Sequence, residues 1–180
     1  APATLFLTGG QGDPLEGEER LLIPSPHVAS FELIPEMSAA EVADTVIVAL
    51  RSGSYPFVVV NFANGDMVGH TAVRDAVIQA VETLDREVGR VLDVAVDEGY
   101  SVILTADHGN CDEMVDPLTG APHTQHTVYP VPCLIVDETP WRLAIGAGIE
   151  SIAPTVLDLL GLPKPGAMHG HSLLIAPAEA

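Results

Sequence analysis

The sequence is poor in positive charge. Its 180 residues include only 7 lysines and arginines against 25 aspartates and glutamates, a formal net charge of −18. Nucleic acids and anionic membrane surfaces attract basic proteins, so a charge of this sign argues against both as partners. An enzyme that acts on phosphate esters would need positive charge from bound metal ions or from another segment.

Cysteine is also scarce, and long apolar runs are absent. Cys111 and Cys133 are too few for a disulfide framework, so we expect free thiols in a reducing compartment such as the cytoplasm. A single disulfide is the less favoured alternative. No apolar run approaches the roughly 20 residues that span a bilayer. The first residues lack the basic segment that opens a signal peptide and begin abruptly, so we expect them to continue from a longer protein.

Apolar runs and helical patterns alternate along the rest of the chain. Apolar residues make up 47% of it, which is enough for the core of one domain over residues 1–180. Residues 57–62 and 101–105 have the continuous apolar character of buried strands, and residues 72–97 show helical spacing. Further strands are expected at 3–8, 21–23 and 131–136, and further helices at 38–52 and 154–160. This order predicts an α/β fold with a mostly parallel sheet flanked by helices.

Signals at the ends of these elements refine the prediction. Ser38 and Glu41 have the spacing of a capping box at the start of the first helix. Gly99 is placed to end the long helix. The last residues, 169–180, are expected to fray.

Acidic and histidine side chains follow the two central strands. They form a set of five candidate metal ligands: Asp66, His70, Asp107, His108 and His126. Carboxylate oxygens and imidazole nitrogens suit Mn²⁺, Zn²⁺ and related ions. Because α/β sheets bind ligands beyond the carboxyl ends of their strands, these side chains are expected to converge there. His123 is an alternative to His126 as the last nitrogen ligand. One such residue alone is more often solvated, but five placed in this way favour a metal site.

The motifs that carry these residues resemble the cofactor-independent phosphoglycerate mutases. The matching stretches are LLIPSPHVASFELIPEMSA, NFANGDMVGHT, TADHGN and PHTQHT, at residues 21–39, 61–71, 105–110 and 122–127. The resemblance implies an alkaline-phosphatase-like fold that is incomplete, without its N-terminal strands and inserted domain. It also implies interconversion of 3-phosphoglycerate and 2-phosphoglycerate through a phosphoserine intermediate, with phosphoglycerate as substrate and a role in glycolysis and gluconeogenesis.

Site roles follow from the same resemblance. It implies that Asp66, His70 and His126 bind one metal ion and that Asp107 and His108 supply part of a second site. The ions are expected to be two Mn²⁺, with Zn²⁺ or Co²⁺ as alternatives. The nucleophilic serine lies outside this chain, so the chain alone is expected to be inactive and to need the missing N-terminal part as its partner. An incomplete sheet would also leave an exposed edge through which the chain could self-associate.

One substitution departs from the family pattern. His27 stands where the family has a lysine near the phosphoryl group. Histidine is shorter and only partly charged near neutral pH, which argues against full mutase activity. Two alternatives therefore stay open. The chain could belong to another phosphotransferase or phosphatase of the alkaline phosphatase superfamily, or be a degenerate metal-binding module without catalysis.

Overall fold

Helices and short strands alternate along the chain. The computed structural model describes residues 12–177. The elements in that range are η1 (Phe31–Leu33), α2 (Ala39–Ser52), α3 (Asn64–Gly69), α4 (Arg74–Asp97), β1 (Val102–Thr105), β2 (Cys133–Val136), β3 (Trp141–Leu143), η2 (Ile149–Ser151), α5 (Ile152–Leu159) and β4 (Leu174–Pro177). The predicted strand at 3–8 lies outside the described residues.

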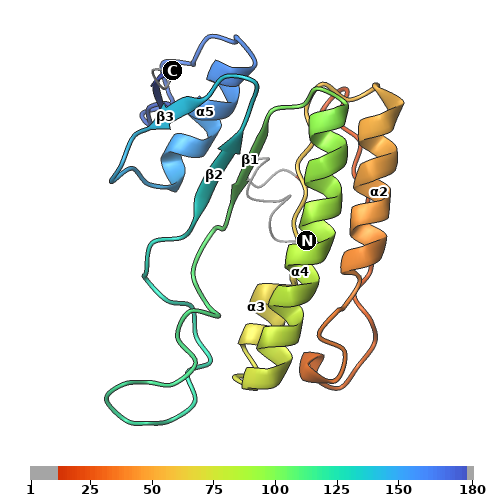
Figure 1. The fold of residues 1–180 in the computed structure, drawn as a ribbon, viewed down its shortest axis with the longest axis vertical. Coiled ribbons are helices and arrows are strands. Elements are labelled where there is room, and N and C mark those ends of the chain that lie inside the picture. The colour runs from red at the N-terminus through yellow and green to blue at the C-terminus, as the bar shows by residue number, and fades with distance from the viewer. Residues whose placement is uncertain (1–11, 178–180) are drawn as a thin grey trace.

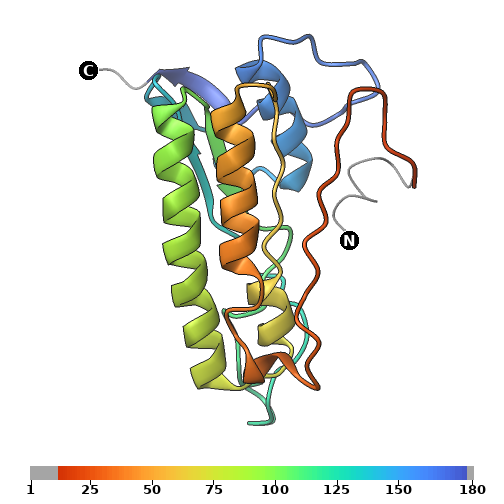
Figure 2. The same cartoon turned by 90° about the vertical axis from the view of Figure 1, so that its right-hand side faces the viewer.

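The long helices α2 and α4 lie side by side and form one layer of the molecule (Figures 1 and 2). Val46 and Leu50 of α2 pack with Ala95 of α4 in one buried cluster. Val58 and Val102 contact the same cluster, which brings the extended segment 57–62 and β1 against the helices. The apolar spacing that predicted both helices therefore corresponds to the faces that are buried.

The helix ends follow the predictions in part. Gly99 (φ 77°) directly follows the C-cap of α4, and Gly53 (φ 62°) ends α2 in the left-handed region that glycine adopts without strain. Ser38 is the N-cap of α2, but its hydroxyl donates to the Pro24 carbonyl (2.8 Å) and makes no capping bond. The predicted capping box is therefore wrong, because the serine ties α2 to the preceding segment instead.

The α/β class is confirmed, but the strand pairing differs from the mostly parallel sheet that was predicted. In the described residues, β1 pairs with β2 and β3 pairs with β4, both antiparallel. The connection from β1 to β2 is a loop that doubles back, whereas a parallel pair needs a crossover connection, usually a helix. Residues 57–62 are extended but are not assigned to a strand. They run beside α2 into α3 without a ladder partner in the described part (Figure 2).

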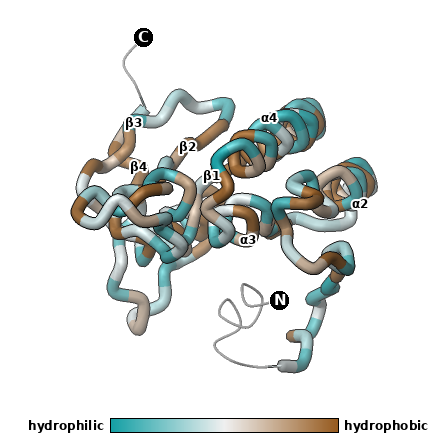
Figure 3. Tube along the Cα trace, turned by 90° about the horizontal axis from the view of Figure 1, so that it is seen from below, coloured by the Kyte–Doolittle hydropathy of each residue, from teal (hydrophilic) through white to brown (hydrophobic). Residues whose placement is uncertain are grey.

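A smaller unit of β3, β4 and α5 lies on the far side of the β1–β2 pair from α4 (Figures 1 and 3). The prediction of a frayed C-terminus is wrong for residues 174–177, which pair with β3 in β4. Residues 21–23 form no strand, and their leucines are exposed. Both hydrophilic and hydrophobic residues occur along the long helices α2 and α4 in Figure 3. Within residues 12–177, no helix has the length and apolar character needed to cross a membrane.

Candidate metal centre

The short helix α3 positions the first two candidate ligands. Its Val68 is fully buried and packs on Ala76, Val77 and Ala80 of α4. Its first residue, Asn64, is buried and donates from Nδ2 to the carbonyls of Pro35 (2.9 Å) and Glu36 (2.8 Å). With α3 held on both sides, Asp66 and His70 stand one turn apart on the same face, as the i, i+4 spacing of a helix requires.

Three ligand-type atoms from two distant segments meet at this face. The Nε2 atom of His70 lies 3.0 Å from Oδ1 of Asp66. The Nε2 atom of His126 lies 3.1 Å from the same oxygen and 3.2 Å from the His70 nitrogen. Tetrahedral ligands on bonds of about 2.1 Å are separated by about 3.4 Å, so this triangle is close to the size that surrounds a divalent ion. The three side chains are 36%, 37% and 48% exposed, which leaves the triangle open to solvent.

The orientation of His70 suits a metal ligand. Its Nδ1 lies 2.8 Å from the Thr124 carbonyl oxygen, which accepts a hydrogen bond from the protonated nitrogen. In the neutral ring this tautomer leaves Nε2 unprotonated, and its lone pair is directed at Asp66 and His126. Metal-binding histidines commonly donate their other nitrogen to a carbonyl or carboxylate in this way.

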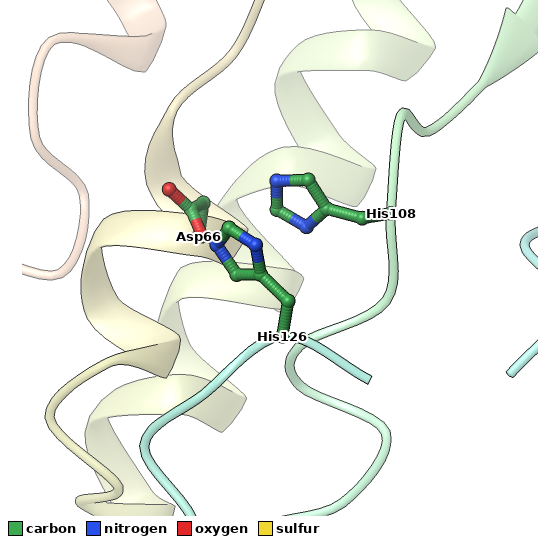
Figure 4. A group of neighbouring side chains, drawn as sticks. All are labelled: Asp66, His108 and His126. Carbon is green, nitrogen blue, oxygen red and sulfur yellow. Dashed lines mark hydrogen bonds and ion pairs between the residues drawn. The ribbon is translucent and has the colours of Figure 1, made fainter. Parts of the chain in front are cut away.

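The loop between β1 and β2 brings His108 and His126 together. Thr127 donates its backbone N–H to the Gly109 carbonyl (2.8 Å) and its hydroxyl to Asp112 (2.9 Å), so the residues that follow the two histidines are tied to each other. The two rings stack with centroids 3.6 Å apart. Asp66, His108 and His126 each present a ligand atom within 4.8 Å of the others (Figure 4).

Gly109 is required for space rather than for a special backbone angle. A glycine directly after a strand often allows a sharp turn, yet Gly109 is not among the described glycines with positive φ. A Cβ atom at this position would lie 2.2 Å from Oγ1 of Thr127 and 2.7 Å from Oδ2 of Asp112. A side chain at Gly109 would therefore force the Thr127 hydroxyl and the Asp112 carboxylate to shift.

The remaining predicted residues lie outside the group formed by Asp66, His70, His108 and His126. The Asp107 side chain is 70% exposed, with Oδ1 3.7 Å from Nε2 of His108. His27 is exposed on the extended segment before η1. His126, and not His123, lies against Asp66 and His70. The Nδ1 atom of His123 is buried and makes no hydrogen bond within the described part of the chain.

Acidic groups and burial act together on the neighbouring thiol. Cys111 donates from Sγ to the Gly65 carbonyl (2.9 Å), at the start of α3. Burial raises the pKa of this thiol, and the negative charges of Asp112 and Asp66 raise it further. Cys111 and Cys133 are both free, as predicted. Burial disfavours charge of either sign at this thiol, and the two carboxylates add a negative local potential that further disfavours a thiolate.

Sequence reasoning missed the residues that support the cluster. Asn110 is 8% exposed and donates from Nδ2 to Oδ1 of Asp66 (2.9 Å), but it was not assigned a role. Asp112, which the sequence does not distinguish from a solvated acidic residue, accepts a hydrogen bond from the Thr127 hydroxyl. The available signal was position, since both residues lie within four positions of His108.

Known proteins resemble this chain over nearly its whole length. A protein named 2,3-bisphosphoglycerate-independent phosphoglycerate mutase from Ectopseudomonas mendocina is 48% identical over 174 residues, covering 97% of this chain and 34% of that protein. A protein of the same name from Symbiobacterium thermophilum is 48% identical over 180 residues, covering 99% and 35%. The chain thus spans about a third of the length of the curated relatives it matches.

A solved structure and a family model agree with these relatives. The structure is Leishmania mexicana phosphoglycerate mutase at low cobalt concentration, with a TM-score of 0.86 and 33% identity, covering 96% of this chain and 34% of that one. The family model described as the metalloenzyme superfamily matches residues 2–164. This match includes most of the chain, and it covers Asp66, His70, His108 and His126. The chain therefore belongs to the metalloenzyme superfamily.

Proposed function

We propose that residues 1–180 are the metal-binding part of a phosphoglycerate mutase that interconverts 3-phosphoglycerate and 2-phosphoglycerate. The observation that carries the metal-binding role is the triangle of Asp66, His70 and His126. A carboxylate oxygen and two imidazole nitrogens lie 3.0–3.2 Å apart. Such acceptors repel one another at this distance unless a proton or a cation lies between them.

The residues around the triangle fit a divalent ion. Two neutral nitrogens and one carboxylate form the donor set of many three-ligand sites, which leave a coordination position for substrate or water. The Thr124 carbonyl fixes His70, and Asn110 holds Asp66, so the ligands are already oriented. Mn²⁺ is the proposed ion, with Zn²⁺ or Co²⁺ as alternatives because these ligand types serve all three.

A second ion is proposed beside the first, with Asp107 and His108 as part of its ligand set. His108 already stacks on His126, and Asp107 has an exposed carboxylate next to it. The remaining ligands and the nucleophilic serine would come from the N-terminal part of the longer protein. Two bound ions would supply positive charge at the phosphoryl group in a chain whose own net charge is −18.

In this proposal the chain's own residues bind the metal ions and orient the ligands, and the chain alone does not turn over substrate. Its proposed partners are the N-terminal part of the same protein and the phosphoglycerate that the whole protein binds. A second copy of the chain is a further proposed partner through the edge of the β1–β2 pair, and a monomeric elution volume in size-exclusion chromatography would contradict that. The proposed location is the cytoplasm.

His27 favours a second candidate function. An exposed histidine stands in place of the family's lysine, and it supports a metal-binding homologue with weak or absent mutase activity. Assaying the full-length protein on 3-phosphoglycerate and on general phosphate esters separates the two candidates. Turnover of 3-phosphoglycerate supports the mutase, and turnover of neither supports the non-catalytic module.

Metal binding is tested by calorimetric titration of the purified chain with Mn²⁺. His126→Ala removes one of three ligands and should weaken binding by more than about 100-fold, since changes outside the ligand shell alone weaken it about 10–100-fold. His169→Ala is the matched control, because that histidine is exposed near the C-terminus and should have no effect. A chain that binds neither Mn²⁺ nor Zn²⁺ contradicts the proposal.

A further inference from the structure

Asn110 makes an unusual pair of contacts with a single residue. Its Nδ2 donates to Oδ1 of Asp66 at 2.9 Å and lies 3.3 Å from the Asp66 backbone carbonyl. The oxygen that it contacts is the one that faces both His70 and His126. One buried amide therefore restrains the carboxylate and the backbone of the same residue.

The other side of the amide is fixed by α3 itself. A Cβ atom at Gly69 would lie 2.3 Å from Oδ1 and 2.7 Å from Cγ of Asn110. The helix backbone thus approaches the amide so closely that any side chain at this position would displace the amide. Rotating the amide by half a turn would place its oxygen against the Asp66 carboxylate, and the repulsion between two oxygens excludes that orientation. Asn110 is therefore held in one orientation between Gly69 and Asp66.

The fixed orientation of Asn110 restricts the rotation of the Asp66 carboxylate. The terminal torsion of an aspartate has a broad energy minimum, so an unrestrained Asp66 would direct Oδ1 over a wide range. The amide selects the rotation that completes the triangle with the two histidines. Ordering the ligand before an ion arrives lowers the entropy lost on binding.

We propose that Asn110 is a positioning residue that presets the Asp66 carboxylate for metal binding, and that Gly69 is a glycine in order to admit it. The inference rests on the proposed metal site. Asn110 would not contact the ion itself. Its removal should weaken binding of Mn²⁺ by about 10–100-fold, which is typical of groups that orient metal ligands.

The test is a double-mutant cycle on the purified chain, with Mn²⁺ affinity measured by calorimetry. Asn110→Ala and Gly69→Ala should each weaken binding, the second because its methyl group displaces the amide. In the double variant, Gly69→Ala should add little, because the atom it displaces is gone. Gly65→Ala is the matched control. It lies in the same helix, but its Cβ would meet only Leu84 at 3.8 Å and Cys111 at 3.9 Å, and its affinity should stay within about twofold of the wild type.

A second measurement separates positioning from general support of the fold. The visible absorption of bound Co²⁺ reports ligand geometry, and it should change in Asn110→Ala while the metal-free unfolding temperature stays close to that of the wild type. An unchanged affinity and spectrum in Asn110→Ala overturns the inference. So does a loss of affinity that appears only together with unfolding of the metal-free variant, or effects of Gly69→Ala and Asn110→Ala that simply add. A wild-type chain that fails to bind Mn²⁺ instead overturns the proposed function.

Discussion

Val68 lies at the contact on which the cluster depends, and replacing it with alanine tests that dependence. The side chain is fully buried between α3 and α4, so Val68→Ala removes two buried methyl groups. Their transfer is worth about 1.6 kcal/mol, and the residual cavity adds about 0.5–1 kcal/mol. The better helix propensity of alanine offsets about 0.5 kcal/mol. The expected loss is about 2 kcal/mol, or about 4–8 °C in unfolding temperature for a chain of this size.

The assay is thermal and urea unfolding followed by circular dichroism. Val48→Ala is the matched control, because it makes the same chemical change on α2 at a side chain that is 70% exposed, and it should change stability by less than about 0.5 kcal/mol. Since α3 carries both Asp66 and His70, Val68→Ala should also weaken Mn²⁺ binding. If the unfolding temperatures of Val68→Ala and Val48→Ala differ by less than about 1 °C, the buried contact of Val68 does not hold α3 on α4.

Three further predictions concern charge and space. The hydrogen bonds from Arg90 and Arg86 lower the pKa of Glu87, so Glu87 stabilises the fold above pH 4.5 and loses this effect as the pH falls through its folded pKa. Glu87→Gln should therefore lower the free energy of unfolding by about 1 kcal/mol at neutral pH, and this free energy should fall less steeply in acid than that of the wild type. Identical urea-unfolding profiles of the variant and the wild type from pH 7 to 3 would contradict this. Gly109→Ala should push the Thr127 arm away and weaken Mn²⁺ binding; an unchanged titration would show that the loop adapts freely. Gly89→Ala, with open space around its position in α4, should raise stability by about 0.5–1 kcal/mol, whereas a lower unfolding temperature would contradict the helix there.

The sequence predicted the helices better than the strands. The apolar spacing of α2 and α4 identifies a buried face without reference to the rest of the chain. Strand pairing depends on partners that a local pattern does not reveal. The run at 57–62 has the composition of a buried strand, yet Phe57 and Val59 are more than half exposed and the segment has no ladder. The strand β4 was missed because its partner β3 is distant in the sequence and a local pattern does not reveal the pairing.

The candidate site was predictable as a set of ligand types but not as an arrangement. The four-residue spacing of Asp66 and His70 is compatible with a shared face, because four residues make about one helical turn. The sequence could not choose between His123 and His126, since that choice depends on how the loop folds back to Gly109. Nor could it reveal Asn110, whose contact with Asp66 spans 44 positions in the sequence.

The two cysteines give the molecule an internal comparison of local motion. Cys133 is exposed on β2, whereas the Cys111 thiol is partly buried and donates a hydrogen bond to the first turn of α3. An alkylating reagent reaches the first thiol in the folded state. The second should react more slowly, because it is partly buried and its pKa is raised, and faster when α3 separates from the loop that follows β1. The ratio of the two rates therefore reports, within one molecule, how well α3 and the loop shield Cys111, and it should change when that region opens more often without unfolding of the rest.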